Sequence, residues 1–269
     1  MKSKAISYPY VAWMALFVVA PIVIIVVYAF TAAGGGFSLE NFHSMAQYAT
    51  AFGRSFLLAA VATVVCLLAG YPLAYFLARE RGWIHRMATM LIMLPMWMNF
   101  LLRTYSWKFL LERNGLLNTL FGLIGLGPFQ MIDTQGAIVL GMVYNYLPYM
   151  VLPIFSVIAK IDPKVVEAAQ DLGANSVTVF RRVIFPLSLP GVLSGITMVF
   201  IPSVSTFAIS RLLGGSKTLL LGNLIDMQFL GSAYNPHLGS AVSLVMMVIV
   251  MVCMAVMNHF GDGEEGVTL

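Results

Sequence analysis

The sequence is short of charge. Only 10% of its 269 residues are Asp, Glu, Lys or Arg, whereas 60% are hydrophobic. Soluble globular domains contain about 25% charged and about 45–50% apolar residues. A chain of this size cannot bury such an excess in a soluble core, so much of it has to face lipid. The composition therefore excludes an ordinary soluble domain and indicates a membrane protein.

Motifs that carry chemistry are also missing. The two cysteines, Cys66 and Cys253, both lie in apolar runs, and no Cys/His cluster has the spacing of a metal site. The sequence has no GxxxxGK[ST] phosphate-binding loop. We therefore expect this chain to bind no metal and no cofactor, and to hydrolyse no ATP by itself. An intramembrane enzyme is a rival class, but it would need ionisable residues inside the spans, whose interiors have essentially none.

Long apolar runs divide the chain into six expected transmembrane helices. About 20 residues cross a hydrocarbon core of about 30 Å. The expected spans are residues 8–30, 55–78, 87–102, 136–159, 187–209 and 238–260. Residues 103–120 are expected along the membrane interface, and 122–135 and 210–237 as loops. The sequence thus predicts an all-α polytopic membrane protein with a single transmembrane domain over residues 1–269.

The distribution of Lys and Arg predicts the orientation. The first apolar run is longer than a signal-peptide core of about 7–15 residues, so we expect it to be retained. With a cytoplasmic N-terminus, the inner set is Lys2, Lys4, Arg79, Arg81, Arg86, Lys160, Lys164, Arg181 and Arg182. The outer set is Arg54, Arg103, Lys108, Arg113, Arg211 and Lys217. This bias agrees with the positive-inside rule and predicts that both termini are cytoplasmic.

The stretch 162–186 is the longest polar interruption in the second half of the chain. Asp162 is a candidate helix N-cap, and Pro163 suits the first helical position. Gly173 stands where a helix end favours a positive φ. One helical stripe carries the apolar residues Val165, Ala168, Ala169 and Leu172. The pattern predicts a short helix outside the bilayer that offers small side chains to a partner.

The same stretch resembles the cytoplasmic EAA loop of bacterial ABC-importer permeases. That loop reads Glu-Ala-Ala, three residues, Gly, nine residues, Ile, any residue, Leu-Pro. Its spacing is matched here by Glu167-Ala168-Ala169, Gly173, Val183 and Pro186. The resemblance implies the type I ABC importer fold. It also implies that an EAA coupling helix receives the motion of an ATPase through Glu167, Ala168, Ala169, Asp171 and Gly173.

Further segments resemble the permease subunits of spermidine/putrescine importers, namely 70–78, 99–105 and 213–229. The resemblance implies a bacterial inner-membrane importer that works by alternating access. Its expected partners are a second permease subunit, an ATPase dimer that holds ATP and Mg, and an extracytoplasmic substrate-binding protein, with no nucleic acid. The expected cargo is spermidine or putrescine.

Other functions stay open from the sequence. Arg211 stands where related permeases often have an acidic residue, and a positive charge there does not help polyamine passage. Another small organic solute or an inorganic ion, moved by a related importer, is therefore the alternative. A stand-alone secondary carrier is less favoured, because it usually needs an intramembrane carboxylate, which the spans lack.

Polar residues at the outer ends of the spans are the candidate substrate pathway. Irregular helices are tolerated in lipid where they line a cavity, which favours the Pro- and Gly-rich fifth span as a lining element. The candidates are Asn99, Arg103, Tyr105, Trp107, Tyr144, Asn145, Ser203, Ser205, Thr206 and Asp226. Simpler explanations remain, because Pro and Gly are common in membrane helices, Arg103 could snorkel to the interface, and Asp226 could be a solvated loop charge.

Overall fold

The computed structural model describes residues 3–32, 34–80, 82–215, 218–231 and 233–261, and these ranges hold helices and no named strand. The α-helices are α1 (Ser3–Met14), α2 (Ala20–Ala29), α3 (Glu40–Met45), α4 (Ala49–Arg79), α5 (Trp83–Trp97), α6 (Phe100–Leu111), α7 (Leu116–Leu123), α8 (Gln135–Ile158), α9 (Pro163–Asp171), α10 (Ser176–Val179), α11 (Phe185–Ser205), α12 (Ala208–Leu213), α13 (Leu221–Phe229) and α14 (Pro236–Gly261). Two π-helices, η1 (Ala15–Val19) and η3 (Phe180–Ile184), join α1 to α2 and α10 to α11.

Five of the helical runs are long and apolar enough to cross a membrane. They are Tyr8–Ala29, Glu40–Arg79, Gln135–Ile158, Ser176–Ser205 and Pro236–Met257. A further candidate is a bent pair, in which α5 is followed by α6 and α7 at a bend of 95°. The described residues therefore form the expected all-α polytopic protein, with five apolar spans, or six if the bent pair crosses the membrane as one broken span.

Several expected boundaries were wrong. The third span was placed at 87–102, but α5 ends at Trp97 because Asn99 caps a new helix that turns away. The fifth span was placed at 187–209, yet the helix begins at Ser176 and ends at Ser205, where Thr206 adopts an extended conformation. The stretch 210–237 was expected as a loop but contains α13 and most of α12.

The core is formed where α4, α8 and α11 pack together. Glycines allow this close approach: a Cβ on Gly70 would lie 3.1 Å from Met150, and one on Gly195 would lie 3.1 Å from the Met150 carbonyl oxygen. Small residues at helix contacts are typical of membrane proteins. The fifth-span glycines thus pack against α8, and α11 runs unbroken through Pro190 and Pro202.

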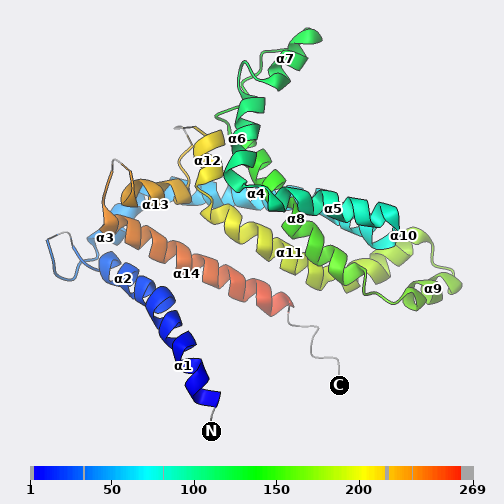
Figure 1. The fold of residues 1–269 in the computed structure, drawn as a ribbon, viewed down its shortest axis with the longest axis horizontal. Helices are drawn as coiled ribbons and strands as arrows, with labels where there is room; N and C mark the ends of the chain where they lie inside the picture. Colours follow the sequence, from blue (N-terminus) through cyan, green and yellow to red (C-terminus); the bar gives the residue numbers. More distant parts are fainter. Residues whose placement is uncertain (1–2, 33, 81, 216–217, 232, 262–269) are drawn as a thin grey trace.

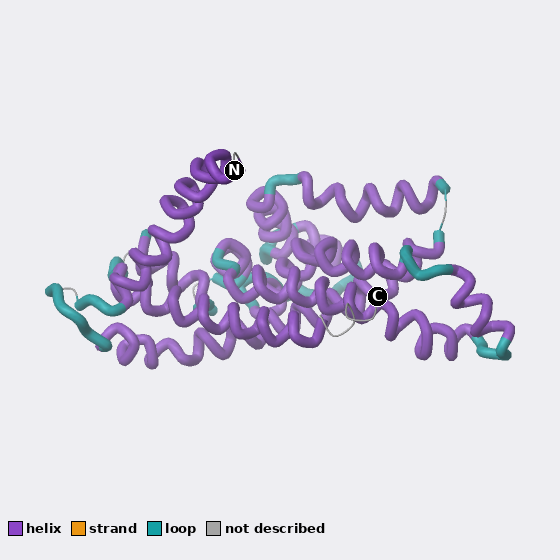
Figure 2. The backbone as a smooth tube through the Cα atoms, turned by 90° about the horizontal axis from the view of Figure 1, so that it is seen from below, coloured by secondary structure: helices purple, strands orange, loops and turns teal. Residues whose placement is uncertain are grey.

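The bundle has two distinct ends. Figure 1 shows α9 and α10 at one end of the body, and α3, α12 and α13 towards the other. The segment α6–α7 projects from the body, whereas α1 and α2 diverge from it on the opposite side. Figure 2 shows the helices running along the length of the body. We call these regions the α9 end and the α12 end.

Some predictions fall on residues outside the described ranges. They are the charges of Lys2, Arg81 and Lys217, and the acidic tail after Gly261. The cytoplasmic placement of the two termini stays a prediction.

Candidate functional site

The start of α9 is fixed by a side-chain cap. The Asp162 carboxylate accepts a hydrogen bond from the Lys164 backbone N–H at 2.9 Å, and the Asp162 carbonyl accepts one from Val165 N–H at 3.0 Å. Pro163 occupies the first turn, where no backbone donor is needed. The helix therefore begins where the sequence indicated, for local reasons.

The end of α9 is a Schellman motif. The Ala174 N–H donates to the Ala169 carbonyl at 3.1 Å, and the Gly173 N–H donates to the Gln170 carbonyl at 2.8 Å. Gly173 has φ +83°, as this motif requires. Asn175 then caps α10 by accepting from Thr178 N–H at 2.9 Å. Two capped corners hold α9 as a short, self-contained unit.

The outward face of α9 is apolar. Val166 and Ala169 pack against the body, whereas Val165 and Ala168 are exposed. Leu172, at the end of the same face, has 90% of its surface exposed. An exposed apolar strip beside exposed polar residues is typical of a docking surface. Glu167, Asp171 and Gly173 are also exposed, so of the predicted coupling residues on α9 and at its end only Ala169 is partly covered by the body.

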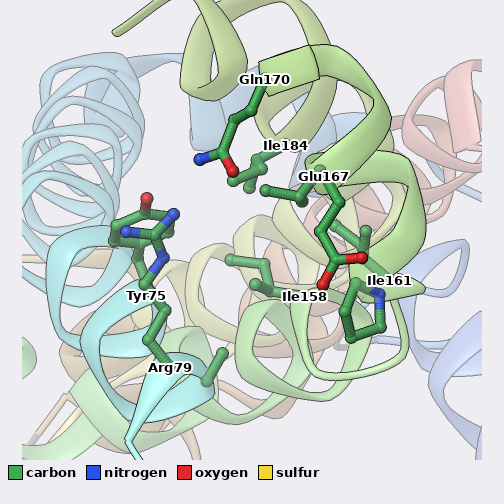
Figure 3. A pocket seen from close by; sticks show the side chains of 10 residues that line it. Tyr75, Arg79, Ile158, Ile161, Glu167, Gln170 and Ile184 are labelled. Carbon is green, nitrogen blue, oxygen red and sulfur yellow. The ribbon is translucent and has the colours of Figure 1, made fainter. Parts of the chain in front are cut away.

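Behind α9 lies a cavity of about 340 Å³. Figure 3 shows Glu167 on one wall and the Arg79 guanidinium lying on the Tyr75 ring on the other, with Gln170 extending from α9. The guanidinium carbon lies 4.5 Å from the ring centroid, a cation–π contact. Tyr75 in turn meets Phe180 edge-to-face at 5.4 Å. The sequence does not predict this cavity, because no local signal indicates that the end of α4 lies beside α9.

The candidate pathway residues are only partly brought together. Arg103 is 8% exposed, and its Nε and Nη1 have no hydrogen-bond partner within the described ranges. On α8, the Tyr146 hydroxyl donates to the Pro202 carbonyl at 3.4 Å, and Thr206, the C-cap of α11, is also buried. Trp107 and Tyr144 meet edge-to-face at 5.4 Å. The burial of Arg103 argues against snorkelling, and a charge without acceptors is costly in an apolar site.

Other candidates form hydrogen bonds within their own helices, although the buried Asn145 Oδ1 has no partner within the described ranges. Asn99 caps α6 by accepting from Leu101 and Leu102 N–H at 2.9 and 3.2 Å. Ser203 donates to the Val199 carbonyl at 2.7 Å, and Asn145 donates to the Gly141 carbonyl at 2.8 Å. The Ser205 hydroxyl bonds within α11, and Tyr105 is exposed.

Asp226 is engaged in an ion pair. Its carboxylate accepts from Arg211 at 3.0 Å, which joins α13 to α12, and Ser210 donates to Asn223 at 2.8 Å across the same pair of helices. The Asp226 side chain is 20% exposed and lies on α13, so it is a partly covered, paired carboxylate. The carboxylate has a partner in this structure, and a cationic solute would have to displace Arg211.

Two further polar residues with structural roles were missed. Ser55 accepts from Leu221 N–H at 2.8 Å and so caps α13 from α4. Asn118 donates to the carbonyls of Glu112 and Phe129 at 3.1 and 3.0 Å and accepts from Phe129 N–H at 2.8 Å, which closes the segment around α7. The contacts of Ser55 join residues far apart in the sequence, so no local pattern could have indicated them.

The fold and its capped helix between spans define a class of protein: a polytopic membrane permease with the type I ABC importer fold. The chain belongs to the family of inner membrane components of binding-protein-dependent transport systems, whose family model matches residues 67–263. It is therefore a multi-pass inner-membrane protein and a transport subunit.

Curated relatives of known name cover most of the chain. The spermidine/putrescine transport system permease protein PotB of Haemophilus influenzae is 37% identical over 88% of this chain and 86% of its own length. PotB of Escherichia coli (strain K12) is 35% identical over 89% of this chain and 90% of its own length. The inner membrane ABC transporter permease protein YdcU of E. coli is 26% identical over 77% of this chain and 70% of its own length.

Solved structures share the fold at low sequence identity. A bacterial ABC transporter that imports the acidic polysaccharide alginate matches with a TM-score of 0.84 and 16% identity, over 96% of this chain and 94% of that chain. The inward-facing MetNI methionine ABC transporter matches with a TM-score of 0.62 and 16% identity, over 81% of this chain and 96% of that chain. These matches establish the architecture and carry no information about cargo.

Proposed function

We propose that this chain is a membrane-spanning subunit of an ATP-driven importer for spermidine and putrescine. The observation that carries the proposal is the 37% and 35% identity, over nearly the whole chain, to two PotB permeases of spermidine/putrescine systems. The expected partners are a PotC-like second permease, a PotA-like ATPase dimer that binds ATP and Mg, and a PotD-like extracytoplasmic binding protein.

The geometry of the α9 end supports a coupling role. Capped at both ends, α9 can move as a rigid unit when a partner moves it. Its exposed apolar face supplies contact area, and Glu167 supplies a charge for a basic group on the ATPase. Closure of the ATPase dimer would pull α9 and, through α10 and η3, displace α11, which packs against α4 and α8. This route gives ATP binding a mechanical path to the bundle.

The α12 end is the proposed substrate side. Buried polar groups lie where α11 ends: Thr206 is its C-cap, the Tyr146 hydroxyl donates to the Pro202 carbonyl, and Arg103 is buried on α6, which packs against α8 and α12. In the alternating-access cycle that we propose, this region opens to accept solute from the binding protein. Both termini are then cytoplasmic, as the distribution of Lys and Arg predicts.

A different small solute is the second candidate. The observation that favours it is the Arg211–Asp226 ion pair, because it places a cation at the α12 end and occupies the carboxylate that a polyamine would use. Binding of spermidine and putrescine by the partner binding protein, measured by calorimetry, separates the two. A binding protein that ignores both polyamines would overturn the polyamine assignment and leave the importer assignment intact.

The coupling role is tested by Glu167→Lys in the complete importer. We expect uptake and transport-stimulated ATPase activity to be lost while the amount of permease in the membrane is unchanged, because Glu167 is exposed and its carboxylate makes no ion pair within the described ranges. Glu40→Lys, an equally exposed reversal on α3 at the other end, is the matched control and should transport normally. Normal uptake by Glu167→Lys would contradict the role.

A further inference from the structure

The end of α4 lies beside α9 and carries a charge of its own. The cavity between them is lined by Tyr75, Ala78 and Arg79 from α4 and by Pro163, Val166, Glu167 and Gln170 from α9. Its two charged groups, Arg79 and Glu167, come from different helices (Figure 3). The surface next to the apolar face of α9 is thus a hollow with one cation and one anion.

The Arg79 side chain is held in place before any partner arrives. Its guanidinium lies 4.5 Å from the centre of the Tyr75 ring, and Tyr75 is fixed by its edge-to-face contact with Phe180 at 5.4 Å. The N–H donors of a guanidinium lie in its own plane, so stacking on an aromatic ring leaves them available for hydrogen bonds. A stacked guanidinium also loses less conformational freedom on binding than an unrestrained one. Arg79 therefore presents its donors towards the cavity at low entropic cost.

Neither cavity charge is neutralised by its own chain. Within the described ranges the structure holds one ion pair, Arg211–Asp226, which lies at the α12 end. A guanidinium favours a carboxylate, which it can bind through two parallel hydrogen bonds. The cavity therefore fits a partner surface that presents an acidic side chain to Arg79 next to a basic group for Glu167.

We propose that the ATPase contacts two elements of this chain, α9 and the end of α4, and that Arg79 binds an acidic side chain of the ATPase inside the cavity. This rests on the proposed function, which supplies the ATPase as the partner. The second contact has a mechanical consequence, because α4 packs directly against α8 and α11. The ATPase would then hold the core of the bundle as well as the coupling helix.

The test is Arg79→Glu in the complete importer, purified through a tag on this chain. We expect the amount of ATPase that co-purifies to fall by at least about tenfold, because loss of one partner of a desolvated interfacial charge pair weakens binding by more than that factor. The amount of permease should not change, since Arg79 is exposed. Arg86→Glu is the matched control, an exposed arginine on α5 that does not line the cavity, and should retain the ATPase. Arg79→Lys should retain part of it.

The outcomes separate this inference from the proposed function. If Glu167→Lys abolishes coupling while Arg79→Glu retains as much ATPase as Arg86→Glu, the second contact is wrong and the coupling role of α9 stands. If both variants keep the ATPase and uptake, the coupling role itself fails. If the double variant Arg79→Glu/Glu167→Arg restores uptake that each single variant loses, the two charges serve each other inside this chain, and an ATPase contact at Arg79 is overturned.

Discussion

The two ends of the bundle differ in the bonding of their polar side chains. At the α12 end, polar side chains bond to neighbouring elements of the same chain: Ser55 caps α13, Ser210 bonds Asn223, and Arg211 pairs with Asp226. Among the described residues of α9 and α10, the side-chain hydrogen bonds serve the two caps, while Glu167 and Leu172 are exposed. The α12 end is held by contacts within the chain, whereas the α9 end exposes contact surface for the partner that we propose.

This difference predicts that substitutions at the two ends affect different properties, namely the stability of the permease and its coupling to the ATPase. Buried polar contacts that join distant segments contribute to the free energy of unfolding, and their loss is costly. An exposed apolar face contributes little to folding but supplies contact area to a complex. Substitutions at the α12 end should therefore destabilise the chain, and those at the α9 end should leave it folded but uncoupled.

The largest effect should come from Gly222→Ala at the α12 end. The added Cβ would lie 2.5 Å from the Thr206 carbonyl oxygen and 2.7 Å from that of Ser205, so backbone has to move. We expect a loss of about 1–3 kcal/mol in the free energy of unfolding. It is measured as a lower melting temperature of the purified permease. Gly122→Ala on α7, which meets nothing within 4 Å, is the control and should melt like the parent protein.

A smaller effect on stability, but a clear one on transport, is expected for Gly173→Ala at the α9 end. The new Cβ meets nothing within 4 Å, so the cost is the backbone strain at φ +83°, about 1–2 kcal/mol. That strain loosens the corner that ends α9 and should lower uptake severalfold. Gly125→Ala, with φ +75° and equally open space on the other side of the bundle, carries the same strain. If both variants reduce uptake equally, the α9 corner has no special role.

The smallest effect should follow exchange of the charges at the α12 end. Arg211 is 70% exposed, and exposed ion pairs contribute about 0–1 kcal/mol. The double variant Arg211→Asp/Asp226→Arg keeps a pair and should transport polyamine within about twofold of the parent. Asp226→Arg alone places two cations together and should be the weaker transporter. A double variant no better than this single one would show that Asp226 acts on the solute rather than on Arg211.

Local signals explain what the sequence could predict. The apolar runs placed the spans, and Asp162, Pro163 and Gly173 placed the ends of α9, because caps and helix periodicity are properties of neighbouring residues. The bend after Trp97 also has a local cause, the Asn99 cap, but the apolar run continues through it and conceals the break.

Long-range contacts explain what the sequence could not predict. The pairing of Arg211 with Asp226 and the cavity between Arg79 and Glu167 depend on how separate helices lie in space. Apolar periodicity does not encode those arrangements in a single sequence. The buried position of Arg103 has the same origin, since only the packing of α6 against α8 and α12 covers it.

The separation of coupling from stability is tested most directly at Leu172. Its side chain is 90% exposed, so Leu172→Asp should leave the membrane level and the melting temperature of the purified permease unchanged. The same variant should lose at least about tenfold of the ATPase that co-purifies with the complete importer, because the charge disrupts an apolar contact at the interface. An importer that retains its ATPase, or a permease that unfolds, would contradict the account of the α9 end as a surface that a partner completes.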